Sequence, residues 1–221
     1  AARVRTMSGH APKLRRQMAL SAGLLALFAV VGGVLVAGTE TLTRDRILEQ
    51  QRASLRSTLN EVLPAQRYSN ALLDDTTTVQ NPALLGSDEP ITAYRARRGT
   101  QPVAVLFPVV APDGYSGDIR LLVGILANGE LAGVRVLNHR ETPGLGDAIE
   151  TRRSDWIRQF AGLSLDAPPA NAWTVRKDGG EFDQFAGATI TPRAVIKAVR
   201  QALVFFEQNQ AILFADTPAT P

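Results

Sequence analysis

The stretch DQFAGATIT, residues 183–191, places two threonine hydroxyls beside a glycine, just ahead of a long segment with an apolar stripe. Gly187 and Ala188 carry little or no side chain, so the main chain can come close to a ligand there. Thr189 supplies a hydroxyl immediately before an expected helix, whose N–H groups and positive dipole end favour a phosphate. The pattern predicts an anion at or near Thr189, with an ordinary turn threonine as the alternative.

A second stretch with chemical potential is HRETPGLGD, residues 139–147, directly after an expected strand. Pro143, Gly144 and Gly146 predict a tight loop that can bring main-chain groups flat against a planar ring. Leu145 could supply an apolar wall, and the alternative is a plain connection between a strand and a helix. A dinucleotide fingerprint is not indicated, because GLGDAI lacks the third glycine.

The amino-acid composition excludes several kinds of redox and metal site. The chain has no cysteine, which excludes disulfides, thiolate catalysis, iron–sulfur clusters and covalent c-type haem. Its two histidines, His10 and His139, are too few for a conventional zinc site. The net charge of +3 is concentrated in residues 1–17, which hold five basic residues and no acid. Nucleic-acid binding is not expected, because it needs a basic face on the folded domain.

Residues 18–38 contain no charged side chain and are long enough for a helix to cross the hydrocarbon core of a membrane. The alternatives are a buried helix of a soluble protein or a cleavable signal peptide, whose apolar region is shorter, about 7–15 residues. The purely cationic tail before the span predicts a cytoplasmic N-terminus. The chain from about residue 40 onward then faces outward, which in a bacterium means the periplasm.

The outer part mixes helical and strand patterns. Residues 44–63 carry leucines on one face and end before Pro64, which predicts an amphipathic stalk helix that continues the span. A loop rich in Pro, Asn, Asp and Thr is expected up to residue 90. Three apolar runs predict strands, and NGE between the last two predicts a hairpin. The expected strands are 103–111, 119–127 and 131–139.

Helices and a second hairpin are expected toward the C-terminus. Ser154 is expected to cap a helix over 155–162, and DGG at 178–180 to turn a hairpin. Thr191 is expected to cap a final helix, 192–208, with Pro192 in its first turn. The predicted fold class is α+β, with a single N-terminal transmembrane helix followed by antiparallel strands and packed helices. The expected parts are a basic tail (1–17), the span (18–38), a stalk helix and loop (39–90), an outer domain (91–215) and a frayed C-terminus (216–221).

Three segments together resemble a known family. HRETPGLGD, then W…QF.G at 156–162, then K.GGEFDQFAGATIT at 177–191 resemble the FMN-binding domain of the G subunit of Rnf electron-transport complexes. Its sister is the C subunit of the sodium-pumping NADH:quinone reductase, and the shorter chain favours the Rnf protein. The resemblance covers the anchor and nearly all of the outer domain.

The resemblance implies a covalent flavin. In this family the phosphate of FMN is joined to a threonine by a phosphoester bond, and the attachment position falls on Thr189. A separate flavin transferase, which uses FAD and a divalent metal, makes the bond. It recognises the surrounding sequence, in which Asp183, Gly187, Ala188 and Thr191 match the family pattern. Ala186 departs from that pattern, because the family usually has Ser or Thr there.

The resemblance also implies which residues surround the flavin. Trp156 is expected in the core rather than against the ring, and Lys177 could neutralise the phosphate. No catalytic residue and no metal ligand of the chain's own is expected. The residues expected to bind the cofactor are Glu141, Thr142, Gly144, Leu145, Gly146, Lys177, Gly187, Ala188 and Thr191.

The implied function is that of a membrane-anchored electron carrier without independent turnover. Its partners would be the other membrane subunits of an Rnf-type complex that couples ferredoxin and NAD redox chemistry to ion translocation. Since the span has no ionisable residue, ion coupling is expected in other subunits. The alternatives are a C-type subunit of the sodium-pumping NADH:quinone reductase, an anchored periplasmic module that binds an anion without covalent chemistry, and an independent periplasmic flavin reductase.

Overall fold

The computed structural model describes residues 11–215, apart from the side chains of 11–17 and 39–45. The chain divides into two compact units, with the boundary between Ser54 and Leu55. The first ten residues of the expected basic tail and the expected frayed segment 216–221 lie outside the described residues.

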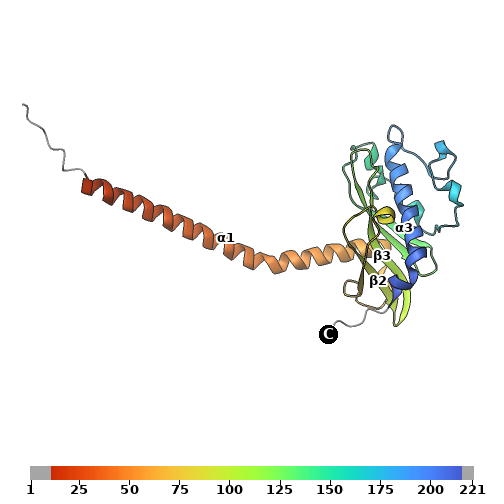
Figure 1. The fold of residues 1–221 in the computed structure, drawn as a ribbon, viewed down its shortest axis with the longest axis horizontal. Helices are drawn as coiled ribbons and strands as arrows, with labels where there is room; N and C mark the ends of the chain where they lie inside the picture. The colour runs from red at the N-terminus through yellow and green to blue at the C-terminus, as the bar shows by residue number, and fades with distance from the viewer. Residues whose placement is uncertain (1–10, 216–221) are drawn as a thin grey trace, which may run out of the picture. The chain divides into compact units, whose positions relative to one another are not determined.

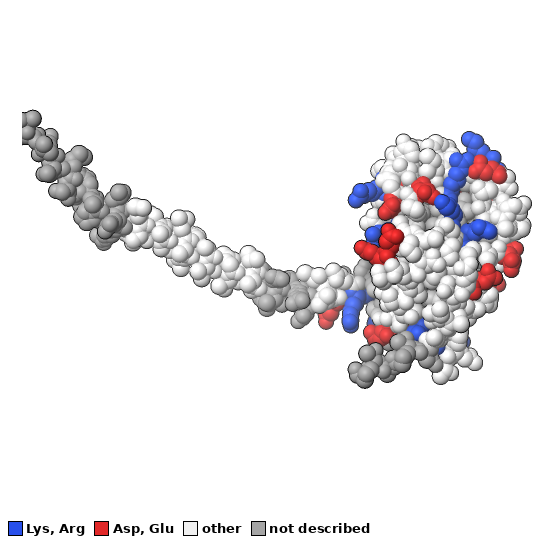
Figure 2. Space-filling view, in the orientation of Figure 1, with Lys and Arg blue, Asp and Glu red and all other residues white. Residues whose placement is uncertain are grey.

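A single helix, α1 (Ala11–Val62), contains both the apolar segment and the expected stalk helix. One stretch of it, Met18–Gly38, is long and apolar enough to cross a membrane. Its large side chains are exposed, with Leu25 at 71% and Phe28 at 69%. In Figure 2 the described part of this stretch carries no charged residue. A helix that exposes apolar side chains in this way is suited to a lipid environment.

The second unit is built on a five-stranded antiparallel sheet in the order β1-β2-β3-β4-β5 (Figure 1). This arrangement confirms the predicted α+β class and the three predicted strands, which are β3, β4 and β5. β1 and β2 were not predicted, and β1 and the short helix α2 (Pro82–Leu85) interrupt the loop that was expected up to residue 90. The strands are β1 (Thr76–Val79), β2 (Ile91–Arg98), β3 (Gln101–Ala111), β4 (Ile119–Leu126) and β5 (Leu131–Asn138).

Both faces of this sheet are covered, which explains the nearly continuous apolar runs in β3 and β4. Along β3, Val105 and Phe107 belong to the larger core cluster, whereas the alternate residue Leu106 belongs to the smaller one. The smaller cluster includes Leu59 and Val62 from the end of α1. The end of α1 therefore packs on one face of the sheet, and the C-terminal helix packs on the other.

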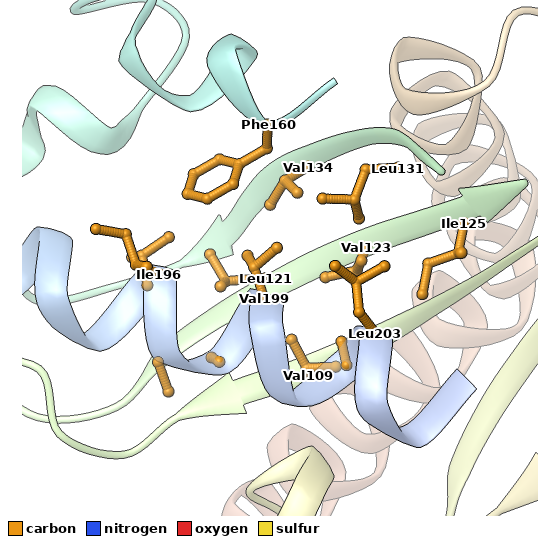
Figure 3. Packing of buried hydrophobic residues seen from close by; sticks show 14 of the residues in the cluster. Val109, Leu121, Val123, Ile125, Leu131, Val134, Phe160, Ile196, Val199 and Leu203 are labelled. Atoms are coloured by element: carbon orange, nitrogen blue, oxygen red, sulfur yellow. The ribbon is translucent and has the colours of Figure 1, made fainter. Parts of the chain in front are cut away.

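That C-terminal helix, α3, spans Ile190–Phe214 and is longer than the predicted 192–208. Its expected apolar stripe is confirmed, because Val195, Val199 and Leu203 are buried. Figure 3 shows Ile196, Val199 and Leu203 facing Leu121 and Val123 of the sheet. The helix lies along one face of the sheet (Figure 1), and Thr191, Pro192 and Ala194 near its start are buried.

The connection between the sheet and α3 consists of short 3-10 turns around an aromatic cluster. The helix predicted over 155–162 is instead the shorter turn η3, and its N-cap residue is Asp155 rather than the predicted Ser154. Ser154 Oγ still accepts the N–H of Trp156 at 3.1 Å. Phe160 stacks on Phe182 with ring centroids 5.0 Å apart. The turns are η1 (Ala65–Arg67), before β1, and then η2 (Gly146–Ile149), η3 (Trp156–Phe160), η4 (Ala170–Ala172) and η5 (Arg176–Asp178).

The predicted hairpin at 178–180 is wrong. Val175 and Phe182 form one isolated parallel bridge, and η5 lies between them. Gly180 packs so closely that an added Cβ would lie 1.9 Å from the carbonyl oxygen of Thr174. The glycines therefore serve a compact turn rather than a pair of strands.

Charged side chains are buried within β2. Arg95 and Arg97 are 4% and 8% exposed, and Asp75 pairs with their Nε atoms at 2.6 and 3.0 Å. Arg97 also donates to the carbonyl of Phe214 at 3.0 Å, near the end of α3. Buried charges are tolerated when they are paired and hydrogen-bonded in this way.

A surface ion pair joins η5 to the first turn of α3. It leads us to expect that part of the protein's stability depends on pH. Arg193 donates to both carboxylate oxygens of Asp178 at 2.7 and 2.8 Å, and these bonds hold the pKa of Asp178 below its usual value. A depressed carboxylate pKa adds stability above the unfolded value, about 3.9, which is lost as the pH falls through the folded value. The melting temperature of Asp178→Asn should be slightly below wild type at pH 7, with the difference vanishing once the pH lies below the lowered folded-state pKa of Asp178. Thermal denaturation of the detergent-solubilised chain measures this, and a difference that persists unchanged at that pH would contradict it.

Candidate functional site

The candidate site is organised around a buried carboxylate. Glu141 follows β5 and is only 4% exposed. One of its carboxylate oxygens accepts the N–H of Ser116 at 3.0 Å, and the other accepts the hydroxyl of Thr191. The carboxylate thus joins the loop before β4, the loop after β5 and the first turn of α3.

A pocket of about 240 Å³ opens beside this junction. We call it the loop–helix pocket. It combines residues from both motifs that the sequence singled out, although some fifty positions separate them. Its lining residues are Tyr115, Glu141, Thr142, Leu145, Gly146, Gly187, Ala188 and Thr191.

The walls of the loop–helix pocket suit a planar, partly apolar ligand. Gly187 has φ +77°, and an added Cβ there would lie 3.6 Å from Leu145 Cδ2. Two of the lining residues are exposed, with Tyr115 at 67% and Leu145 at 44%. Pockets for larger ligands usually measure about 300–1,000 Å³, so a flavin would fill this pocket and extend beyond it.

Thr189 occupies the N-cap position of α3, with φ −74° and ψ −23°. Its side chain makes no capping hydrogen bond and is partly exposed. It directly follows Ala188 of the loop–helix pocket without being one of the lining residues. The first N–H groups of a helix have no intrahelical partner, so this end of α3 suits a phosphate.

The prediction that Thr191 caps α3 is wrong. The helix begins two residues earlier than predicted, and Thr191 lies fully buried inside its first turn. Its hydroxyl donates to Glu141, which is fifty positions away in the sequence. The Thr191 hydroxyl, which the sequence pattern predicted to cap the helix, is therefore engaged in a tertiary hydrogen bond to Glu141.

The remaining predicted site residues are not among those that line the pocket. Gly144 is exposed at φ +79°, and its N–H donates to Asp147 Oδ1 at 2.8 Å. Lys177 is exposed on η5. Asp183 is exposed and pairs with Arg176 at 3.2 Å.

Trp156 contacts the segment that leads into Thr189. It is 9% exposed, which confirms its expected place in the core, and its Nε1–H donates to the carbonyl of Asp183 at 2.7 Å. It also contacts Phe185 edge to face, with ring centroids 5.1 Å apart. The main chain that leads into Thr189 is thereby packed onto the aromatic cluster.

Sequence reasoning missed Tyr115 as a pocket residue. It lies in the segment GYSGD, where Gly114 and Gly117 flank an aromatic side chain outside any strand. Gly114 is tightly packed, because an added Cβ would lie 3.1 Å from Glu141 Oε1. In the sequence, the aromatic residue between two glycines was the feature that could have pointed to Tyr115 as a ligand-binding residue. Across the part of the chain that the structure describes, no group of three or more His, Asp or Glu residues could hold a metal ion.

Comparisons with known proteins match most of the chain to one family. The family model of the FMN-binding domain matches residues 114–204, and the RnfG N-terminal region matches residues 7–62. The G subunit of an ion-translocating oxidoreductase complex from Shewanella loihica is 47% identical over 200 residues, which cover 90% of this chain and 94% of that protein.

Two further relatives carry the same name. The G subunit from Pseudomonas aeruginosa UCBPP-PA14 is 51% identical over 205 residues, covering 93% of this chain and 96% of that protein. The one from Vibrio cholerae is 49% identical over 187 residues, covering 85% and 89%. With an apolar N-terminal helix, an FMN-binding domain that contains the loop–helix pocket, and such identity over most of its length, the chain belongs to the family of G subunits of Rnf-type ion-translocating oxidoreductase complexes.

Proposed function

We propose that this chain carries FMN covalently, through a phosphoester between the flavin phosphate and Thr189, and passes electrons between other subunits of its complex. The observation that carries the proposal is the position of Thr189. Its hydroxyl makes no capping bond, stands at the N-terminus of α3 and adjoins the loop–helix pocket. No other threonine among the described residues combines these features.

The proposed roles of the chain's residues are to bind and orient the cofactor. FMN would supply the redox chemistry when bound. Tyr115 and Leu145 would contact the ring, and Gly187 would allow the main chain to approach it. The first N–H groups of α3 would stabilise the phosphate, which remains an anion after esterification. Lys177 is proposed to add positive charge near it.

Attachment would require a second enzyme. His139 is the one histidine among the described residues, and it bonds to Glu150 rather than to Thr189. We therefore propose that a flavin transferase activates the hydroxyl, with Asp183, Gly187 and Ala188 in its recognition segment. The Thr189 oxygen bonds to the flavin-side phosphorus of FAD, the pyrophosphate bond breaks, and AMP leaves.

The direct test is the chain produced with and without its flavin transferase. With the transferase, the band on a denaturing gel should fluoresce, and the intact mass should rise by one FMN minus one water. Without it, neither change should occur. An unchanged mass in the presence of an active transferase would refute covalent attachment and leave an anion-binding module as the explanation. Substrate turnover by the isolated chain would instead favour an independent flavin reductase.

A topology prediction accompanies this function. The cationic tail predicts a cytoplasmic N-terminus and a periplasmic FMN-binding domain. A periplasm-dependent reporter fused after Pro221 should therefore be active, and a cytoplasm-dependent reporter at the same position should be inactive. The opposite pair of results would contradict both the orientation and flavin attachment in the periplasm.

A further inference from the structure

His139 lines a second cavity, which is more polar than the loop–helix pocket. This cavity has a volume of about 410 Å³ and is lined by His139, Arg135, Glu61, Glu150 and Arg152, among others. The His139 side chain is 10% exposed. Two residues further along the chain, Glu141 lines the loop–helix pocket.

The hydrogen bonds of His139 define its protonation state in this arrangement. The main-chain N–H of Glu141 donates to His139 Nδ1 at 3.0 Å. A main-chain N–H can only donate, so Nδ1 must present a lone pair and the ring proton must be on Nε2. That Nε2–H donates to Glu150 Oε1 at 2.8 Å. His139 is therefore neutral when the Glu141 main chain has the position described here.

The ionised form of Glu150, which accepts the hydrogen bond from the His139 ring, is favoured by its neighbours. Hydrogen bonds from Arg152 and, to a lesser extent, from His139 hold the pKa of Glu150 below its usual value. The other charged groups of the cavity also form a pair, because Arg135 Nε lies 3.3 Å from Glu61 Oε2. The charges that face His139 from α1, β5 and the loop after η2 are thus two carboxylates, each with an arginine.

Protonation of His139 would break one contact and strengthen another. An imidazolium carries N–H on both nitrogens, so Nδ1 could no longer accept the Glu141 N–H, and two donors would face each other. The ring would gain charge attraction to Glu150, while the Glu141 main chain would lose its acceptor. Since the Glu141 carboxylate holds Ser116 and Thr191, a shift there would loosen the wall of the loop–helix pocket.

We propose that neutral His139 is a positioning residue for the flavin site, and that its protonation releases Glu141 and loosens the pocket around the ring. The inference rests on the proposed function, because it requires FMN in the loop–helix pocket. The fluorescence of the bound flavin would then depend on the pH.

The test follows FMN fluorescence from pH 8 to pH 5 in the full-length flavinylated chain, with oxidised free FMN as the reference. Wild type should show an inflection that free FMN lacks. His139→Asn places an uncharged acceptor near the Nδ1 position, so it should keep the pH 8 properties down to pH 5. His139→Gln lacks that acceptor and should show the pH 5 properties throughout.

Glu150→Gln provides a matched variant that keeps His139 itself. Removing the carboxylate disfavours the imidazolium, so the inflection should move to lower pH. A purely structural histidine would lower stability without moving a pH profile. An inflection that survives in His139→Asn, or wild-type properties that stay constant, would overturn the inference while the fluorescent gel band remains. Absence of that band would overturn the proposed function and the inference together.

Discussion

Thr189→Ala should produce a chain of normal stability that contains no covalent flavin. The Thr189 side chain makes no capping hydrogen bond and is partly exposed, so its removal costs the fold little. It does remove the only oxygen that the proposed phosphoester can use at this position. The fluorescent band should disappear, and the intact mass should equal that of the unmodified variant in the presence of the transferase.

Two further substitutions separate the roles of the neighbouring threonines. Thr189→Ser keeps a hydroxyl and should restore part of the fluorescence. Thr191→Val removes the donor to the buried Glu141 carboxylate, so it should lower the free energy of unfolding by about 1–3 kcal/mol. The chain that folds should still carry the fluorescent band. Persistent fluorescence in Thr189→Ala, together with loss of fluorescence in Thr191→Val, would contradict flavin attachment at Thr189.

Gly146→Val should damage both the fold and the flavin site. An added Cβ at Gly146 would lie 2.8 Å from Glu141 Cβ and 2.9 Å from both Glu141 Oε2 and Thr191 Oγ1. A branched side chain must therefore force apart the hydrogen bond that joins the loop after β5 to α3. Overpacking and a lost buried hydrogen bond together should cost about 3–5 kcal/mol. Denaturant unfolding in detergent and the flavin content per chain measure the two effects.

Gly144→Ala is the matched control in the same loop. Gly144 has φ +79°, and an added Cβ would meet no atom within 4 Å. Its cost should be limited to the strain of a left-handed residue, about 1–2 kcal/mol. The flavin content of the folded chain should stay near that of wild type. Equal losses in the two variants would show that the contact with Glu141 and Thr191 is not the cause.

Several parts of this protein could be predicted from the sequence because their signals are local. The uncharged segment 18–38 depends only on composition and length. Strands β3, β4 and β5 and the helix α3 follow from runs and stripes of apolar residues. The motifs at 139–147 and 183–191 pointed to a ligand through glycine, hydroxyl and helix-end chemistry, and the loop–helix pocket unites seven of their residues.

Other parts depended on partners that are distant in the sequence. β2 was not predicted because two arginines, Arg95 and Arg97, suggest an exposed segment. In the structure both are buried, and their charges are paired with Asp75, while Arg97 also donates to a carbonyl at the end of α3. The glycines at 179–180 looked like a hairpin turn, but packing against Thr174 requires a compact turn.

The amino-acid sequence by itself determined the span, most of the sheet, the C-terminal helix and the two ligand motifs, because apolar periodicity and local main-chain chemistry suffice for these. Only the tertiary structure decided the use of the hydroxyls and of the imidazole. Thr191 donates to Glu141 across fifty positions, which leaves Thr189 at the helix end without a capping bond. The tautomer of His139 is determined by Glu141 on one side and Glu150 on the other. Such contacts depend on how segments meet in space, and a linear pattern does not encode that directly.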